Sequence, residues 1–398
     1  MSKILIISGQ FIPFTKSLGG ILRVYSFIKL LKKQHEVFLL VSKPIKNKNY
    51  GYLGLPRKDI SKVNINYISN KSLKITSSVF NYKLLRNIFY LLGIDYAFYL
   101  NSKYLEKCYD LIKKNNINYV IVSSPPFSLF YLVKNIKKKF KNIKIILDYR
   151  DGWSTRINNI FLFPLKYIVK NFIEKKILNY SDYIIAATLN IKSKVSSLVN
   201  YKKKIILIRN GYLSKPKKKQ NKNKKIKIGY FGLVSDDNSS YRNIRIIFDI
   251  IKNNKILQDK FVFEFYGNND IQSQRIKCFK SFKFKKNISY KNALNKMTKM
   301  DFLLIIHTEK STSKEMVTSK FYDYLSSGSP IINISSGKNE AGEIIKKYKL
   351  GKNINYLEDD LTNFLITLKK YKKKLKWNKN LKIFSRDYQN KKLLKMIN

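Results

Sequence analysis

Cysteine and histidine are scarce in this chain of 398 residues. The sequence has two histidines and two cysteines, Cys108 and Cys278, which lie far apart. Neither cysteine has a second cysteine or a histidine at the spacing of a metal site. The sequence therefore argues against a disulfide framework and against a zinc site, and it fits a reducing compartment.

Long apolar runs are also missing. No uninterrupted stretch of about 18 or more apolar residues occurs, so we expect no transmembrane helix. The first residues, MSKILIISG, lead directly into a strand pattern and lack the long apolar core of a signal peptide. We therefore expect a cytoplasmic protein.

Acidic residues are few compared with basic ones. The 25 Asp and Glu face 80 Lys and Arg, which gives a formal net charge of +55. Such an excess attracts polyanions, namely nucleic acid, anionic lipid or phosphorylated substrates. However, Lys, Asn, Ile and Tyr are abundant along the whole chain, as the codons of an AT-rich genome favour. An anionic membrane surface stays a candidate partner, whereas no nucleic acid is expected, because no recognised nucleic-acid motif accompanies the charge.

Short apolar runs alternate with helical patterns, which indicates a doubly wound α/β protein. A polar, basic segment, YLSKPKKKQNKNKK, separates two such series. We expect domains at residues 1–212 and 213–383, followed by a terminal helix within 384–398. The predicted strands are KILIIS (3–8), EVFLLVS (36–42), YVIVSS (119–124), KIILDYR (144–150), YIIAAT (183–188), KIILIRNG (204–211), KIKIGYFG (225–232), FVFEFYG (261–267), NISY (287–290), DFLLIIH (301–307) and PIINIS (330–335).

The most informative stretch is EMVTSKFYDYLSSGSP, from Glu315 to Pro330. It lies between two predicted strands, and its residues 319–326 have helical spacing. Glu315 thus follows a strand, while Asp323 lies inside the next helix. Open α/β sheets bind ligands beyond the carboxyl ends of their strands, and helix N-termini bind phosphate there. Because carboxylates accept hydrogen bonds from sugar hydroxyls, the pattern predicts a nucleotide-sugar site.

This stretch resembles the E-x7-E signature of the retaining glycosyltransferases of family 4, in the form SK-(L/F)-(F/Y)-(E/D)-YL-x-x-G-x-P of bacterial surface-polysaccharide enzymes. Lys320, Gly328 and Pro330 are in register, but the second acid is Asp323 instead of the usual Glu, which shortens its reach by one methylene group. The resemblance covers nearly the whole chain and is weaker between about Lys43 and Asn118. It implies the GT-B fold, in which two Rossmann-like, doubly wound domains face a cleft and the last helix packs back on the first domain.

The first half of the chain carries further motifs of this family. The run from Asp148 to Trp153, DYRDGW, is similar to D-x-R-D-x-W, which implies that Asp151 lines the cleft. Alternatively, Arg150 pairs with Asp148 and holds the loop. Gly19-Gly20 resembles the glycine-rich loop that approaches a phosphate or sugar closely. Asn210 resembles the x-N-G motif of the interdomain hinge, although Asn-Gly is also common in ordinary turns.

The second half implies the donor site. Gly232 ends a predicted strand, and Arg242 matches the basic residue that the family places against the donor diphosphate, a role that suits a bidentate guanidinium. Lys320 is a second candidate cation, and His307 either contacts the nucleotide or packs locally. The implied donor-binding residues are Gly19, Gly20, Asn210, Gly232, Arg242, His307, Lys320 and Asp323. The implied catalytic residues are Glu315, Asp151 and Arg242.

The implied reaction is transfer of a sugar, with retention, from a UDP- or GDP-sugar to a lipid-linked or oligosaccharide acceptor of a capsule, an O-antigen or a similar polymer. Enzymes of this fold typically need no metal, and no Asp-x-Asp metal motif occurs, so neither a metal nor a cofactor is expected. Two alternatives are a nucleotide-sugar epimerase of the same fold and a basic nucleic-acid-binding protein.

One segment suggests a membrane contact. The residues from Phe80 to Tyr104 mix aromatic, aliphatic and basic side chains, which suits the inner face of the cell membrane. A helix buried against the first sheet would need the same apolar residues, so both interpretations stay open.

Overall fold

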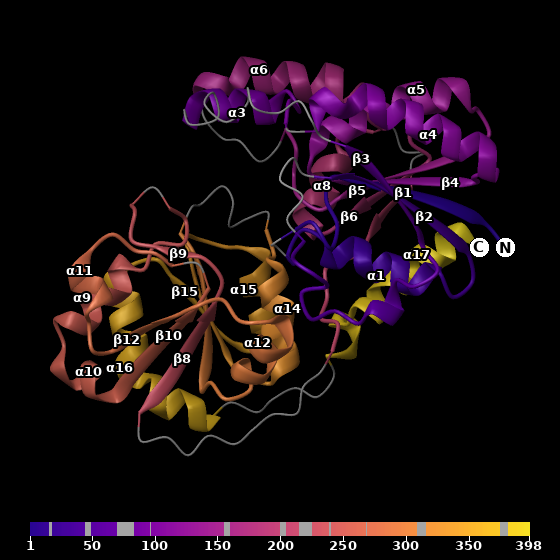
Figure 1. Ribbon diagram of the computed structural model, residues 1–398. Helices are drawn as coiled ribbons and strands as arrows, with labels where there is room; N and C mark the ends of the chain where they lie inside the picture. The colour runs from indigo at the N-terminus through magenta and orange to yellow at the C-terminus, as the bar shows by residue number, and fades with distance from the viewer. Residues whose placement is uncertain are drawn as a thin grey trace. The chain divides into compact units, whose positions relative to one another are not determined.

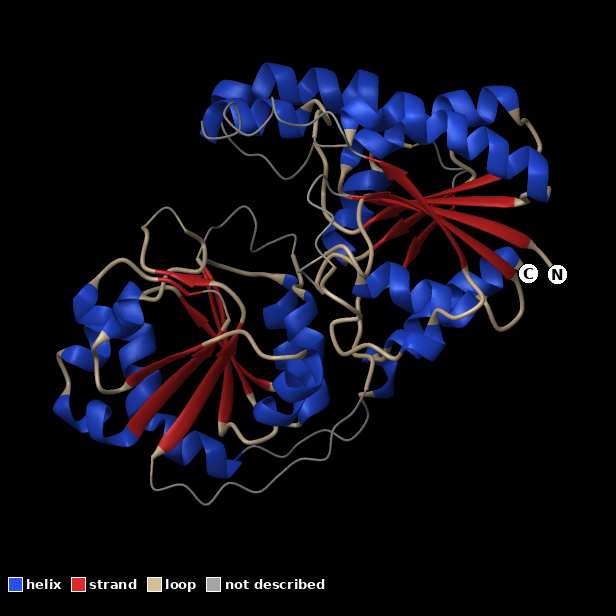
Figure 2. Cartoon of the chain, viewed as in Figure 1, coloured by secondary structure: helices blue, strands red, loops and turns tan. Residues whose placement is uncertain are grey.

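The computed structural model describes residues 1–15, 18–43, 49–69, 83–95, 97–154, 160–199, 204–214, 225–238, 240–267, 269–308, 316–374 and 381–398 (Figure 1). They form two compact units: unit 1 comprises Met1–Arg209 and Arg386–Asn398, and unit 2 comprises Asn210–Ser385. Each unit is a parallel sheet flanked by helices (Figure 2). The expected class, two Rossmann-like α/β units, is therefore confirmed.

Unit 1 contains a seven-stranded parallel sheet of order β3-β2-β1-β4-β5-β6-β7. The strands are β1 (Lys3–Ser8), β2 (Glu36–Lys43), β3 (Asn64–Ser69), β4 (Tyr119–Ser124), β5 (Lys144–Tyr149), β6 (Tyr183–Ala186) and β7 (Lys204–Leu207). The central strands are aliphatic runs buried on both faces, as parallel strands between two helical layers must be. The strand order reverses between β1 and β4, and doubly wound sheets bind ligands at this switch point.

Helices cover both faces of this sheet. Figure 1 shows α1 and α17 on one face and α3, α4, α5 and α6 on the other. The helices are α1 (Leu22–Leu31), α3 (Lys83–Leu91), α4 (Asn101–Asn115), α5 (Leu132–Lys139), α6 (Phe163–Ile168), a π-helical turn (Val169–Glu174), α7 (Lys175–Asn179), α8 (Leu189–Ser196) and α17 (Arg386–Ile397), with 3-10 turns at Arg57–Asp59, Phe98–Leu100, Phe127–Tyr131 and Ile160–Leu162. Because α17 packs against α1, the expected return of the last helix to the first unit is confirmed.

Unit 2 contains a six-stranded parallel sheet of order β12-β10-β8-β13-β14-β15 and a small sheet of β9 with β11. The strands are β8 (Ile226–Phe231), β9 (Val234–Ser235), β10 (Phe261–Tyr266), β11 (Asn269–Asp270), β12 (Phe282–Lys285), β13 (Phe302–His307), β14 (Ile331–Ser335) and β15 (Gly351–Asn355). The helices are α9 (Arg245–Lys252), α10 (Lys255–Lys260), α11 (Gln274–Lys277), α12 (Tyr290–Met297), α14 (Ser319–Ser327), α15 (Glu340–Tyr348) and α16 (Glu358–Lys374), with a 3-10 turn at Lys382–Phe384. The order reverses between β8 and β13, which sets the switch point of this unit.

One predicted strand is wrong, and the predicted strands omit the edge strands β3, β12 and β15 and the two-residue strands β9 and β11. The residues NISY (287–290) are a loop and the first residue of α12, whose N-cap Ser289 accepts a hydrogen bond from the N–H of Asn292. The strand of this region is β12, which precedes them. The missed strands β3 and β15 lie at sheet edges, and their sequences, NINYIS and GKNIN, lack the continuous apolar run of a central strand.

A buried carboxyl group lies in the π-helical turn of unit 1. Glu174 is 1% exposed, and its carboxylate accepts hydrogen bonds from the hydroxyl and the N–H of Ser154. Burial raises the pKa of Glu174 from the ordinary 4.5 to about 7, although these hydrogen bonds act in the opposite direction. Burial, and then the neighbouring Glu174 carboxylate, raise the pKa of Tyr149 well above its ordinary value. Glu174 therefore changes its charge near neutral pH inside the fold.

We expect Glu174→Gln to alter how the stability of unit 1 depends on pH. Between pH 4.5 and 7, Glu174 is protonated in the folded chain but ionised in the unfolded chain, so wild-type stability falls as pH rises. The loss reaches roughly 3 kcal/mol above pH 7. Because Gln carries no charge, the variant gains this much relative to the wild type between pH 5 and 8. Urea unfolding at four pH values measures the gain, with exposed Glu106→Gln as the control, and a pH-independent difference would contradict the prediction.

Candidate functional site

The switch point of unit 2 brings together the chain after β8 and the chain after β13. Gly232 follows β8, and β13 ends at His307. The next helix that the structure describes, α14, begins at Ser319. Glu315 lies between His307 and Ser319 in the sequence, outside the described residues. The described part of this candidate site therefore consists of the loop after β8 and the first turn of α14.

Lys320, the second residue of α14, is held over Tyr230. Its Nζ lies 3.9 Å from the ring centroid and donates a 2.7 Å hydrogen bond to the hydroxyl. That hydroxyl donates in turn to the carbonyl of Leu233, at 2.9 Å. Gly232 has a φ of 141°, and a Cβ atom there would lie 2.7 Å from Lys320 Nζ. The backbone at 232 therefore favours glycine, and a Cβ atom there would displace the lysine amine.

The charge of Arg242 acts on Lys320. Burial, and then the charge of Arg242, lower the pKa of Lys320 well below its ordinary value. Arg242 lies in the loop between β9 and α9, and its guanidinium carbon is 4.7 Å from the centroid of the Tyr241 ring. Within the described part of the chain, neither Lys320 nor Arg242 forms an ion pair with a carboxylate.

The N-terminus of α14 adds further donors. Its N-cap residue, Thr318, makes no side-chain hydrogen bond to the first turn. The first N–H groups of a helix lack partners within the helix, and they carry a partial positive charge. Together with Lys320 in the same turn, they are suited to bind an anion with several oxygen atoms, such as a diphosphate.

His307 packs beside the loop that carries Arg242. Its ring centroid is 5.0 Å from that of Tyr241, and the N–H of Thr308 donates to the Tyr241 carbonyl at 3.0 Å. His307 is 4% exposed. The structure thus shows local packing of this histidine, and its contact with a nucleotide stays a prediction.

Asp236 anchors the same loop, and the sequence analysis missed it. Its carboxylate accepts hydrogen bonds from the N–H groups of Gln272, at 3.0 Å, and Ser273, at 2.8 Å. Although burial acts to raise it, these hydrogen bonds hold the pKa of Asp236 below its ordinary value. No sequence motif marks this residue, because its partners are backbone groups of a distant segment.

Asp323 has a protein partner. It is 7% exposed, and its Oδ1 accepts a 2.7 Å hydrogen bond from the hydroxyl of Tyr290, the first residue of α12. α12 follows the carboxyl end of β12, so the hydrogen bond joins α14 to a second helix start at the ligand edge of the sheet. The role of Asp323 toward a ribose stays a prediction.

The switch point of unit 1 contains a cavity of about 90 Å³. Its lining residues are Ser8, Gln10, Thr15, Gly20, Ile21, Pro125 and Arg150. The guanidinium of Arg150 donates hydrogen bonds to the carbonyls of Gly20 and Pro125, which ties the loop after β1 to the loop after β4. Because small-molecule sites usually measure about 300–1,000 Å³, this cavity suits one small polar group.

Asp148 pairs with Arg23, so its suggested pairing with Arg150 is wrong. The Asp148 side chain is 0% exposed, and its Oδ1 lies 2.7 Å from Nη2 of Arg23. The hydroxyl of Ser123 also donates to Asp148, at 2.8 Å, and Arg23 donates to the carbonyl of Ile208, at 2.8 Å. The pair therefore connects α1 with β4, β5 and the chain after β7.

The remaining candidates are placed as follows. Trp153 is 0% exposed, and its indole N–H donates to the carbonyl of Leu91 at 2.9 Å, so this side chain belongs to the core. Asp151 is partly exposed just beyond β5. Gly19 and Gly20 are exposed in the turn before α1, and Asn210 is the first residue of unit 2.

The described residues contain neither a metal-binding cluster nor a helix that could span a membrane. No group of three or more His, Cys, Asp and Glu side chains in this part of the chain is placed to hold a metal ion. No helix among the same residues has both the length and the apolar character needed to cross a bilayer.

Solved structures with the same architecture match the whole chain. Sucrose-phosphate synthase from Thermosynechococcus elongatus has a TM-score of 0.69 at 12% identity, over 100% of this chain and 98% of that one. HepE from Anabaena, solved in complex with UDP, has a TM-score of 0.60 at 10% identity, over 100% and 99%. The lipopolysaccharide outer core galactosyltransferase WaaB has a TM-score of 0.60 at 14% identity, over 99% of each chain. The fold is therefore GT-B. In sequence, the chain matches no protein-family model and no curated protein.

Proposed function

We propose that this chain is a retaining glycosyltransferase that moves a sugar from a nucleotide diphosphate sugar to a lipid-linked or oligosaccharide acceptor. The observation that carries this proposal is the position of Lys320, held over Tyr230 in the first turn of α14 at the switch point of unit 2, where the charge of Arg242 acts on it. Neither cation has an ion-pair partner among the described residues, and a donor diphosphate would neutralise both. The GT-B fold and the resemblance of Glu315–Pro330 to family 4 support the same function.

In the proposed mechanism, the acceptor hydroxyl attacks the anomeric carbon on the face from which the diphosphate leaves. The bond between this carbon and the diphosphate oxygen breaks, negative charge grows on the leaving group, and the proton of the acceptor hydroxyl passes to the departing oxygen. Lys320, Arg242 and the first N–H groups of α14 stabilise that charge. Glu315 holds hydroxyls of the donor sugar, and Asp323 holds hydroxyls of the ribose. Because the acceptor itself attacks, no side chain is assigned as a nucleophile.

The structural relatives suggest the classes of donor and acceptor. HepE was solved with UDP, and WaaB is named for the lipopolysaccharide outer core. We therefore propose a UDP-sugar as the donor and a cell-surface polysaccharide as the product. A lipid-linked acceptor lies at the inner face of the cell membrane, so the enzyme would act there as a peripheral cytoplasmic protein. At the diphosphate, Lys320 and Arg242 would take the place of a metal ion.

A donor screen tests the proposed activity. The purified protein is incubated with UDP- and GDP-sugars, with and without lipid-linked and oligosaccharide acceptors, and the release of nucleotide is measured. We expect release that depends on an acceptor, and a product with the anomeric configuration of the donor. Conversion of the nucleotide sugar without an acceptor would instead identify an epimerase. If no nucleotide sugar is bound or turned over, the proposal is wrong.

We expect UDP to bind more tightly at lower pH because of Lys320. The pKa of Lys320 is lowered in the free protein by burial and by Arg242, and a bound diphosphate raises it. UDP affinity is then highest at pH values below the pKa of Lys320 in the free protein. Between that pKa and the higher pKa in the complex, affinity falls as pH rises, by up to about tenfold per pH unit. Calorimetry between pH 7 and 9, above the second phosphate pKa of about 6, measures this slope and the proton uptake on binding.

The variant Lys320→Met tests whether Lys320 causes the pH dependence of UDP binding. It removes the titrating amine, so the pH slope is expected to disappear and UDP affinity to fall about 10- to 150-fold, the cost of one hydrogen bond to a charged group. Lys296→Met, at an exposed position of α12, is the matched control. An unchanged slope in Lys320→Met would assign the pH dependence to another group.

A further inference from the structure

The outer face of one helical run in unit 1 is apolar. The run comprises the 3-10 turn Ile160–Leu162, α6, the π-helical turn and α7. Five large side chains project from it into solvent and are here named the aromatic ridge: Phe161 (85% exposed), Phe163 (64%), Tyr167 (58%), Ile168 (48%) and Phe172 (64%). So many large exposed apolar side chains within one short segment indicate an interaction surface.

The aromatic ridge lies on the opposite side of the run from the core. Leu162, Val169, Ile177 and Leu178 are buried in the hydrophobic core of unit 1. These buried residues attach the run to the fold, and surface helices usually carry polar side chains on the other face. Figure 1 shows α6 in the helical layer on one face of the sheet. The stability of the fold therefore explains the inner apolar face but leaves the outer one unexplained.

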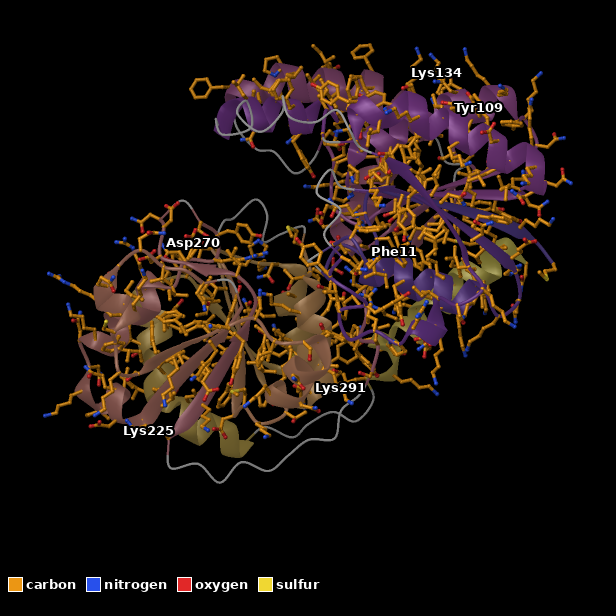
Figure 3. All side chains as sticks on the ribbon, viewed as in Figure 1. Phe11, Tyr109, Lys134, Lys225, Asp270 and Lys291 are labelled. Carbon is orange, nitrogen blue, oxygen red and sulfur yellow. The ribbon has the colours of Figure 1, made fainter. Side chains whose placement is uncertain are left out.

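All charged side chains that this run exposes are basic. Lys166 and Lys170 are partly exposed, and Lys175 and Lys176 are exposed. The single acid of the run, Glu174, is 1% exposed. Lys134 on α5, labelled in Figure 3, lies on the same side of the sheet. Aromatic rings enter the headgroup region of a bilayer while neighbouring lysines attract anionic lipid.

We propose that the aromatic ridge docks unit 1 on an anionic lipid surface. The basic charge of the run favours an anionic lipid surface as the partner, because exposed rings and exposed lysines lie together on one face. A second copy of the chain fits poorly, because a twofold interface would place this basic face of the run against the same basic face of the other copy. The net charge of +55 adds further repulsion between two copies.

A smaller apolar group accompanies the aromatic ridge. Leu85 on α3 is 39% exposed, and Phe98 and Tyr99, in the following 3-10 turn, are 38% and 54% exposed. The hydrogen bond from Trp153 to the carbonyl of Leu91 ties the end of α3 to the chain that leads into the run. This group extends the surface available to a lipid headgroup layer.

The sequence places membrane contact in the segment from Phe80 to Tyr104. In the structure Leu91, Leu100 and Tyr104 of this segment are fully buried, whereas Leu85, Phe98 and Tyr99 are exposed, so each interpretation fits part of the segment. Phe80 lies outside the described residues. The aromatic ridge itself lies outside this segment.

Co-sedimentation of the full-length protein with vesicles tests the proposal. We expect binding to vesicles of phosphatidylglycerol and phosphatidylcholine, weakening with salt, and none to phosphatidylcholine alone. Replacing Phe161, Phe163 and Phe172 together by Ser is expected to lower the apparent partition coefficient at least roughly 100-fold. The control replaces Ile256 and Leu357, exposed apolar residues of unit 2, by Ser and should leave partitioning unchanged.

A second pair of variants tests the charge. One replaces three lysines of the run by Gln, and its control replaces three exposed lysines of unit 2 by Gln; the positions are Lys170, Lys175 and Lys176 against Lys277, Lys280 and Lys352. Both variants lose the same net charge. We expect the first to lower partitioning about tenfold or more relative to the second, since each basic residue near an anionic surface adds to binding.

Three results would overturn the proposal. The first is equal recovery in the supernatant with both lipid mixtures, and the second is equal partitioning of the aromatic variant and its control. The third is a concentration-dependent dimer, seen by sedimentation velocity, that the aromatic variant abolishes; it would assign the aromatic ridge to a second copy. UDP binding, measured without vesicles, should be the same in all these variants, so failure of lipid docking and failure of the proposed function are separate outcomes.

Discussion

Asp148→Ala is expected to destabilise unit 1 by about 3–5 kcal/mol. The side chains of Arg23 and Asp148 are 1% and 0% exposed and lie 2.7 Å apart. Removing the carboxylate leaves the guanidinium in the core without its counter-ion, and Ser123 loses an acceptor as well. Since Arg23 also holds the carbonyl of Ile208, the damage extends from α1 and β5 to the chain after β7.

A double variant shows whether the destabilisation by Asp148→Ala comes from the unpaired charge or from lost packing. Arg23→Met with Asp148→Leu removes both charges and keeps apolar volume, so it should be markedly more stable than Asp148→Ala. Unfolding is followed by the fluorescence of Trp153, which lies in the core of unit 1. The only other tryptophan, Trp377, lies outside the described residues and is replaced by Phe so that the signal reports on unit 1 alone. If the single and double variants are equally unstable, the loss comes from packing.

The central strands were predictable because their burial determines their composition. A parallel strand between two helical layers must be apolar on both faces, and KILIIS and YVIVSS coincide with β1 and β4 to the residue. Edge strands lack this constraint, which is why β3 and β15 escape detection. NISY was misassigned because a serine before a helix and a polar strand end look alike in a short sequence window.

Side-chain pairing was much less predictable. The positions of Arg242 and Lys320 follow from the resemblance, because both come after strands whose carboxyl ends meet at the switch point. The pairing of Asp148 with Arg23 depends on a contact across 125 residues of sequence, and Arg150 was the nearer candidate. Tyr290 is similarly distant from Asp323, so no local pattern indicates their hydrogen bond.

The aromatic ridge could not be predicted from the sequence, for a different reason. The stretch FLFPLKYIVKNFI is apolar except for Lys166, Lys170 and Asn171, and a helix that is apolar on most sides usually lies in a core. Periodicity cannot show which of its apolar residues face the sheet. The structure separates them, because Leu162 and Val169 are buried while Phe161 and Phe163 are exposed.

Glu315→Ala and Asp323→Ala are each expected to abolish sugar transfer, but they should differ in their effect on UDP binding. Glu315 is proposed to hold two hydroxyls of the donor sugar. At about 1.5–3 kcal/mol for each hydrogen bond to a charged group, its loss lowers kcat/KM by about 10²- to 10⁴-fold. UDP has no donor sugar, so its Kd should be unchanged in Glu315→Ala. Turnover like that of the wild type in a folded Glu315→Ala variant would refute the assignment.

Asp323→Ala should weaken the binding of UDP itself, because its proposed partner is the ribose. The expected loss is about 10- to 150-fold in Kd, measured by calorimetry. Tyr290→Phe is the control, since it removes the hydroxyl that donates to Asp323 at 2.7 Å but keeps the carboxylate. Its UDP affinity should stay within about threefold of the wild type. If Asp323→Ala instead binds UDP as well as the wild type does, the carboxylate serves only to join α14 to α12, and the ribose must be bound by other groups.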